Sequence, residues 1–402
     1  MSHPQRGGDE MSPRSLQAIL APLSVDEFRN KYSGRSPLYV SGVNGRFRHL
    51  FNWDDLARLL ESHSLEPPRL KIVKAGKTIA KERYLRHLGE MTRIDGGVLS
   101  LLLDEGATLI INVIDDLVPP IAELADEVGE SLGGRPAVNL YATWRSEHGF
   151  DPHSDYHDVL VLQLAGRKEW AIHQPTRTDP LRGDAFEAPP AGSQPDRVET
   201  LEDGDLLYLP RGWIHAPVPA GEPSLHLTIS LTYPTGAGFL DWLTTQLKSE
   251  PEVRAAIPGS EARLAWTERM SAILREAISG DSVDRYLMHK EARRTARPHF
   301  SFPDFGRIPP TDWDESTVVR PSSQHRLVIE HSADDGSMLV AAGHLLPCSR
   351  LVAAALARPT STRPVTLGEL EAELSEGEVT QFRQLLKLLT TFGLLQMTRG
   401  NR

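Results

Sequence analysis

Cysteine is almost absent from this sequence: Cys348 is the single one in 402 residues. One thiol cannot close a disulfide within the chain or build a multi-cysteine metal cluster, so side-chain packing has to stabilise the fold. Proteins without disulfides are typical of reducing compartments, and we therefore expect a cytoplasmic protein.

Long apolar segments are absent as well. No uninterrupted apolar run approaches the roughly 20 residues that a bilayer-spanning helix needs, and residues 1–14 lack the apolar stretch of a secretory signal. We expect neither membrane insertion nor secretion, and we predict that residues 1–14 are a disordered N-terminus.

Positive charge is scarcer than negative charge. The 44 Lys and Arg residues against 54 Asp and Glu residues give a net charge of −10. The field of such a surface repels nucleic-acid phosphates and attracts basic proteins or peptides. Charged residues make up 24% of the chain and hydrophobic residues 40%, as in ordinary soluble globular proteins, and the length predicts two or three domains.

Short strands dominate residues 137–233. Glycines and prolines separate these strands, and the Pro-rich residues 180–195 indicate a surface excursion between two of them. Many short strands with frequent turn signals favour a sandwich or barrel over a parallel α/β sheet. The candidate strands are residues 138–143, 158–164, 168–173, 205–209 and 224–231.

Helical patterns dominate on both sides of this β segment. Before it, residues 121–132 show an amphipathic pattern that ends at Gly133. After it, the sequence predicts helices at 238–248, 260–279 and 283–297, a Pro-rich linker, and a small domain with a helix pair at 366–374 and 380–390. The predicted divisions are 15–234, with its core at 137–233, then the helical region 235–300, the linker 301–326 and the last domain 327–402.

Two motifs in the β segment carry residues suited to metal chemistry. His153 and Asp155 are two residues apart, so at the start of a strand both side chains would point to one face. His215 follows the predicted strand at 205–209, and neighbouring antiparallel strands can bring it to the same place. Two histidines and one carboxylate on one face form the ligand set that selects non-haem Fe(II) for oxygen chemistry.

A lone His-x-Asp pair is a weak signal, because a histidine in a loop is most often solvated or hydrogen-bonded. Here both motifs fall in the β segment and each adjoins a predicted strand, which strengthens the interpretation. His157 shares the parity of His153 and Asp155 and is a competing ligand, but we favour a role on the substrate side. His226 is expected to pack or hydrogen-bond inside its own strand.

Five sequence blocks resemble the JmjC-type cupins of the ribosomal oxygenase group, densely over residues 137–233. They are Asn139-Leu-Tyr141, Pro152-His-Ser-Asp155, Gly166-Arg-Lys-Glu-Trp170, Gly204-Asp-Leu-Leu-Tyr-Leu-Pro-Arg-Gly-Trp-Ile-His215 and Leu225-His-Leu-Thr-Ile-Ser230. The resemblance implies an α+β fold with a mainly β core, in which a double-stranded β-helix (cupin or jelly roll) precedes a helical dimerisation region and a winged-helix-like C-terminal domain.

The same resemblance implies roles for individual residues. It assigns the metal to His153, Asp155 and His215, and the distal carboxylate of 2-oxoglutarate to Lys168. A dianionic cosubstrate in a barrel does need a cationic partner, although an exposed strand lysine is the alternative for Lys168. Residues that match the lining of the cosubstrate pocket are Asn139, Tyr141 and, less distinctively, Thr228. Residues beside the motifs, where a substrate would enter, are Arg145, Tyr156, His157 and Trp213.

The implied function is that of an Fe(II)- and 2-oxoglutarate-dependent dioxygenase, which uses O₂ to hydroxylate a histidine or arginine side chain of a protein. A basic ribosomal protein would suit the acidic chain. The alternatives are a peptide natural product, a free amino acid or a methyl-lysine as substrate, or a non-catalytic metal-binding cupin that recruits a partner. Nucleic acid is not expected at the last domain, because glutamates crowd its helix pair. Another metal cupin would have no use for Lys168.

Overall fold

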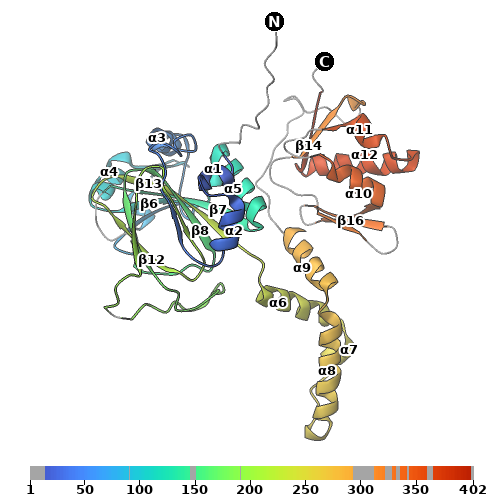
Figure 1. Cartoon of the computed structure of the whole chain (residues 1–402). Coiled ribbons are helices and arrows are strands. Elements are labelled where there is room, and N and C mark those ends of the chain that lie inside the picture. Colours follow the sequence, from blue (N-terminus) through green and yellow to red (C-terminus); the bar gives the residue numbers. More distant parts are fainter. Residues whose placement is uncertain are drawn as a thin grey trace. The chain divides into compact units, whose positions relative to one another are not determined.

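A computed structural model describes residues 14–89, 91–144, 151–190, 192–292, 312–321, 328–331, 336–341, 344–359 and 365–399. The chain forms two compact units, residues 1–233 and 234–402, and the elements of each are labelled in Figure 1. The boundary falls within one residue of the predicted end of the β domain.

The first unit is built on two facing antiparallel sheets, which confirms the predicted mainly β core. The large sheet has the order β1 (Leu38–Val40), β11 (Leu206–Leu209), β8 (Asp158–Ala165), β13 (Ser224–Thr232), β7 (Arg135–Thr143), β6 (Thr108–Ile111), β2 (Leu70–Lys74) and β3 (Lys77–Thr78). The small sheet has the order β10 (Arg197–Leu201), β9 (Lys168–His173) and β12 (Ile214–Pro219). A separate hairpin joins β4 (Leu85–Leu88) to β5 (Met91–Ile94).

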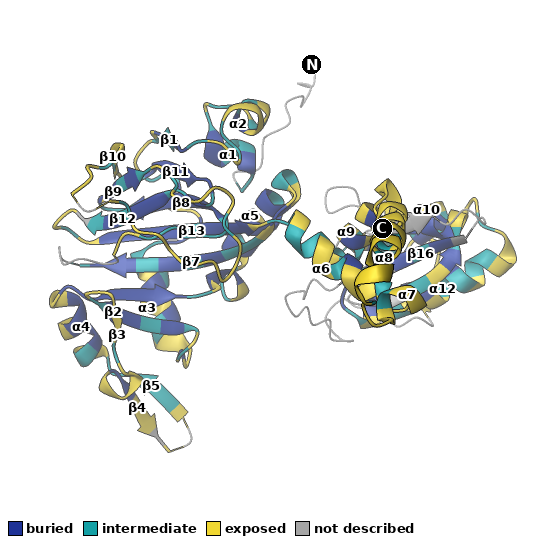
Figure 2. Cartoon of the chain, turned by 90° about the horizontal axis from the view of Figure 1, so that it is seen from below, coloured by how far each residue is buried: buried dark blue, intermediate teal, exposed yellow. Residues whose placement is uncertain are grey.

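Strand β8 shows why the core strands have continuous apolar runs. Its even-numbered side chains, such as Leu160, pack into the cluster beneath the covering helices. Its odd-numbered side chains, such as Val161, pack with Trp170 and Ile172 of β9 between the sheets. Both faces of β8 are therefore buried, and Figure 2 shows β8 and β13 as largely buried strands.

Helices pack against the outer face of the large sheet. These helices are α1 (Leu16–Leu20), α2 (Val25–Lys31), α3 (Trp53–Ser62), α4 (Gly96–Asp104) and α5 (Pro119–Leu132), with 3₁₀ turns η1 (Lys81–Arg83) and η2 (Ile114–Asp116). The side chains of Ser24 and Asn52 accept hydrogen bonds from backbone N–H groups in the first turns of α2 and α3. Gly133, with φ +70°, ends α5 at the predicted residue.

The second unit combines helices with two small sheets. Its first part contains α6 (Gly236–Leu247), α7 (Pro251–Arg254), η3 (Ser260–Ala262), α8 (Arg263–Ala277) and α9 (Gly280–Ala292). One sheet has the order β18 (Val365–Thr366), β14 (Val318–Pro321) and β19 (Leu395–Thr398); the other has the order β15 (Val328–His331), β16 (Gly336–Ala341) and β17 (His344–Ser349). The last helices are α10 (Arg350–Ala357), α11 (Leu367–Glu371) and α12 (Glu376–Thr391). Within the described part of the chain, no helix has the length and apolar character needed to cross a membrane.

Three sequence predictions need correction. Residues 318–321 are the central strand β14, not linker, because Val318 and Val319 pair with β18 and β19 despite the prolines around them. Arg14 is not part of a disordered tail, since its guanidinium pairs with Glu123 of α5. His215 follows the strand at 205–209 as expected, but it lies within a further strand, β12, that the sequence did not predict; prolines are compatible with β12 because it is an edge strand of the small sheet.

Candidate metal centre and its pocket

The predicted metal ligands converge at one end of the barrel. One ligand atom from each of His153, Asp155 and His215 lies within 4.8 Å of the others. Within the described ranges this is the one group of three or more His, Cys, Asp or Glu side chains placed to share a metal ion. The convergence is confirmed, although residue 155 is not in a strand as expected.

Backbone hydrogen bonds tie the two ligand segments together. His153 and His215 form an isolated antiparallel bridge, with N···O distances of 3.1 and 2.8 Å. The Gly212 N–H donates to the Asp155 carbonyl at 2.8 Å. Gly212 has a φ of +86°, and a Cβ there would lie 2.7 Å from the Arg177 carbonyl oxygen, so the turn that presents His215 requires glycine.

The hydrogen bonds of the two imidazoles leave one nitrogen of each for a metal. Nδ1 of His153 lies 3.0 Å from the Asp151 carbonyl oxygen, and Nδ1 of His215 lies 3.0 Å from that of Trp213. When Nδ1 carries the hydrogen in this way, Nε2 carries the lone pair that a metal ligand needs. Burial, and then His153, lowers the pKa of His215 to about 4. Its imidazole is therefore neutral at pH 7, as a metal ligand must be.

His157 is not part of this ligand group. Its Nε2 lies 3.8 Å from Asp155 Oδ1, and its ring meets the Tyr156 ring edge-on at 5.0 Å. The structure therefore separates the three ligands from the histidine that the sequence left as a competitor.

Strands β7 and β13 carry the residues predicted to line the cosubstrate site. Their register places Tyr141 opposite His226 and Asn139 opposite Thr228. The rings of Tyr141 and His226 stack 4.9 Å apart, with 2° between their planes. Burial, and then Asp155, raises the pKa of Tyr141 to about 12, and its hydroxyl is hydrogen-bonded to the side chain of Asn139. The predicted lining residues therefore share a face of the sheet.

Strand β9 brings a buried cation to the same space. Lys168 is 1% exposed and has no ion pair among the described residues. Burial lowers its pKa to about 7. Two residues along the strand, the Trp170 ring lies 5.9 Å from that of His215 and 5.7 Å from that of His226. The alternative of an exposed strand lysine is therefore wrong.

Two more polar atoms in this pocket lack partners. Trp170 Nε1 and His226 Nδ1 are buried, and neither has a hydrogen-bond partner among the residues that the structure describes. A buried cation and unused polar nitrogens are costly unless an acceptor joins them. A dicarboxylate with one end at the metal ligands and the other at Lys168 would provide such an acceptor, so these residues fit 2-oxoglutarate.

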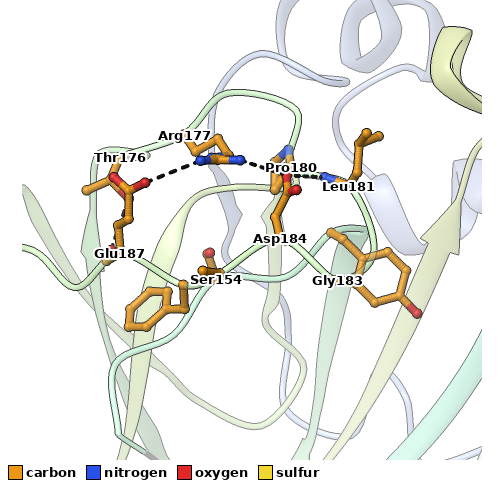
Figure 3. Close-up of a pocket in the computed structure, with 11 residues that line it drawn as sticks. Ser154, Thr176, Arg177, Pro180, Leu181, Gly183, Asp184 and Glu187 are labelled. Carbon is orange, nitrogen blue, oxygen red and sulfur yellow. Dashed lines mark hydrogen bonds and ion pairs between the residues drawn. The ribbon is translucent and has the colours of Figure 1, made fainter.

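The loop between β9 and β10, predicted as a surface excursion, forms a small pocket against the ligand segment. Arg177 pairs with Asp184 at 3.2 Å and with Glu187 at 3.4 Å, as Figure 3 shows. The opposite wall contains Ser154 and Tyr156, which alternate with the ligands along the chain. The Arg182 guanidinium lies 5.9 Å from the centre of the Tyr156 ring. Ion pairs within the loop thus fix its shape where it lines this pocket.

The remaining predicted contacts have mixed outcomes. The Trp213 side chain packs on the apolar cluster between the sheets, and only its carbonyl serves the site, by orienting His215. Arg145 lies outside the described residues. Sequence reasoning missed Trp170 and the unused nitrogen of His226. The sequence did contain a signal for both residues. Trp170 is two residues from Lys168 on β9, and His226 is two residues from Thr228 on β13, so each pair faces the same side of its sheet.

Comparison with known proteins agrees with this geometry. Residues 118–239, which contain all three ligands and Lys168, match the JmjC domain family. Over 228 residues, 54% of the chain, the sequence is 32% identical to ribosomal oxygenase 1 of Rattus norvegicus. Residues 118–239 thus match a JmjC domain, and the chain is similar to proteins of the ribosomal oxygenase group.

The JmjC relatives are longer proteins. The match covers 36% of the rat oxygenase, and 42% of a bifunctional lysine-specific demethylase and histidyl-hydroxylase NO66 of Dictyostelium discoideum, which is 27% identical over 225 residues. The chain therefore spans less than half the length of these two relatives. The X-ray structure of Escherichia coli YcfD shares the fold, with a TM-score of 0.59 and 17% identity over 94% of this chain and 98% of that one. Another YcfD structure contains cobalt and 2-oxoglutarate.

Proposed function

We propose that this JmjC domain is an Fe(II)- and 2-oxoglutarate-dependent oxygenase that hydroxylates an amino-acid side chain of a protein. The observation that carries the proposal is the combination of the His153, Asp155 and His215 group with the buried, unpaired Lys168 in one pocket. The names of the relatives support it, as does the cobalt and 2-oxoglutarate in a YcfD structure.

When bound, iron and 2-oxoglutarate would supply the oxidising chemistry, with O₂ consumed and succinate and CO₂ released. The residues of the chain would hold the metal and the cosubstrate in position. His153, Asp155 and His215 would hold the iron, as two histidines and one carboxylate do in non-haem Fe(II) oxygenases. Lys168 would hold the far carboxylate of the cosubstrate by a charge-assisted hydrogen bond. The apolar side chains between the sheets exclude water from this end of the pocket.

His226 offers a test of the cosubstrate pocket. We expect His226→Phe to keep the stacking on Tyr141 and to weaken 2-oxoglutarate binding about tenfold, because one hydrogen bond to a charged group is lost. The measurement is a calorimetric titration of 2-oxoglutarate into protein loaded with Mn(II) under anaerobic conditions. Thr267→Val, on exposed α8, is the control and should bind as the wild type does. Unchanged affinity in His226→Phe would exclude this contact.

The proposed substrate is a basic ribosomal protein, with histidine or arginine as the target. The net charge of −10 favours such a partner, and the relatives are named ribosomal oxygenases. The test is to incubate the protein with ribosomes, Fe(II) and 2-oxoglutarate and to search the ribosomal proteins for a mass increase of one oxygen. An unmodified ribosome together with normal 2-oxoglutarate turnover would direct the search to peptides, free amino acids or methyl-lysine.

We also propose, as part of this function, a cytoplasmic homodimer that pairs through the helices of residues 235–292. None of the described residues of α8 is buried, and its leucines Leu264 and Leu274 are 72% and 40% exposed. A helix that exposes large apolar side chains and buries none is typical of a protein–protein interface. The winged-helix-like character of the last domain stays a prediction.

The dimer can be tested with charged substitutions. We expect Leu264→Glu with Leu274→Glu to shift the protein from dimer to monomer in sedimentation-velocity runs, because burying two carboxylates in the interface is unfavourable. Ala265→Glu on another side of α8 is the matched control. A wild-type protein that is monomeric at all concentrations would contradict the proposal.

A further inference from the structure

Residues 69–94 form a basic segment in an otherwise acidic chain; we call this segment the basic arm. It contains 8 Lys and Arg residues against 2 Glu residues, a net charge of +6. The rest of the chain contains 36 of the 44 Lys and Arg residues and 52 of the 54 Asp and Glu residues, a net charge of −16. The arm comprises β2, β3, η1 and the β4–β5 hairpin.

Two hairpins of the arm place like charges directly opposite each other. Lys74 faces Lys77 across β2 and β3, and Arg86 faces Arg93 across β4 and β5. Like charges at such positions destabilise a hairpin. Strand β3 is the edge of the large sheet, and Figure 2 shows the largely exposed β4–β5 hairpin extending beyond that edge. The positive charge therefore lies on a projecting surface.

Carboxylates neutralise only part of this charge. Ion pairs join Lys74 to Glu105, Lys81 to Glu66, Arg86 to Asp95 and Arg69 to Asp116. No described carboxylate pairs with Lys71, Lys77, Arg83 or Arg93. Lys77 and Arg83 are exposed, and Arg93 donates one hydrogen bond to the Glu61 carbonyl. Four cations are thus available to a ligand.

The arm begins beside the pocket. Lys71 lies opposite Ile110 of β6, and Ile110 lies opposite Tyr141 of β7, so the register puts Lys71 on the same sheet face as Tyr141. The β2–β3 turn also reaches the ligand segment, because a Cβ on Gly76 would lie 3.3 Å from the Asp151 carboxylate. A molecule bound along the arm would therefore approach the mouth of the metal centre.

We propose that the basic arm binds the phosphodiester backbone of RNA. An acidic protein partner would need an apolar centre to its interface, but among the described residues of the arm Met91 is the one large apolar side chain that is strongly exposed. Phosphate contacts need only cations on an accessible surface. The choice of RNA over DNA rests on the proposed function, since a ribosomal substrate is surrounded by RNA.

The test is fluorescence anisotropy of a labelled stem-loop RNA with the full chain at several salt concentrations. We expect the triple variant Lys77→Glu, Arg83→Glu and Arg93→Glu to bind at least about tenfold more weakly. The plot of log K against log salt should become shallower by about 2 to 3, since each lost phosphate contact removes about 0.7 to 0.9. The control variant changes the net charge equally at exposed residues of the second unit that lie outside the proposed dimer helices: Arg320→Glu, Lys387→Glu and Arg399→Glu.

Further measurements separate this proposal from the proposed function. The arm variant should keep its 2-oxoglutarate turnover, which also shows that it folds. Wild-type protein that turns over 2-oxoglutarate but shows no salt-dependent RNA binding would overturn the RNA proposal alone. Equal RNA affinities of the arm and control variants would also overturn it, as would tighter binding of poly-glutamate or duplex DNA than of RNA.

Discussion

Turnover of 2-oxoglutarate is expected to fall more than about 100-fold in His153→Ala and in Asp155→Ala. Substitution of residues that only hydrogen-bond to a metal ligand typically lowers metal affinity or activity 10- to 100-fold. His153 and Asp155 are placed to be ligands themselves, so the loss should be larger. The backbone bridge between residues 153 and 215 does not depend on either side chain, so both variants should fold. The measurement is succinate formed per enzyme, with thermal unfolding as the check on folding.

His157→Ala is the matched control for the metal centre. It removes a histidine from the same segment that lies 3.8 Å from Asp155 but outside the ligand group. We expect it to bind metal as tightly as the wild type. Full turnover in folded Asp155→Ala, or equal loss of metal binding in His157→Ala, would refute the assignment of the ligands.

Lys168→Met is expected to have two opposite effects. Affinity for 2-oxoglutarate should fall about 10- to 100-fold, because a charge-assisted hydrogen bond in a buried site is lost. The protein without cosubstrate should become more stable, because an unpaired buried cation is replaced by an apolar side chain of similar length. Calorimetric titration measures the first effect and urea unfolding the second. Lys248→Met, at an exposed position, should change neither.

The pH dependence of stability gives a sharper test of Lys168. Burial lowers its pKa from the ordinary 10.5 to about 7. Between these values the unfolded chain binds a proton that the folded chain does not, so the free energy of unfolding rises with pH from about 7 to about 10. Below about pH 7 the cost of the buried charge is present in full. Lys168→Met should remove this rise, measured by urea unfolding at several pH values without cosubstrate. An identical pH dependence in both proteins would show that Lys168 is not buried as a cation.

The strands around the metal centre were predictable because their signals are local. The runs that became β7, β8, β9, β11 and β13 are apolar, short and bounded by turn residues, and the structure shifts their predicted ends by at most three residues. Strand β12 escaped prediction because Pro217 and Pro219 obscure its pattern. Only its place at the edge of the small sheet makes them compatible with a strand.

The net charge of the chain gives no sign of the basic arm. A net charge of −10 averages over the whole chain and predicts an acidic surface, but binding depends on the charges that share one surface. Cross-strand pairs such as Arg86 and Arg93 concentrate positive charge on two hairpins. That concentration depends on the register of the hairpins, which composition does not reveal.

The sequence by itself predicted the three side chains that converge as candidate metal ligands, the lysine that the structure buries beside them, and the mainly β core. Residue type and spacing indicated His153 and Asp155, the pattern of short apolar runs indicated the strands, and the resemblance to a family indicated Lys168. Tertiary structure decided which polar atoms lack partners among the described residues, namely His226 Nδ1, Trp170 Nε1 and the cation of Lys168. Burial and register arise only when β7, β9, β12 and β13 meet, because a side chain loses its water, and so comes to need a ligand, only in the assembled barrel.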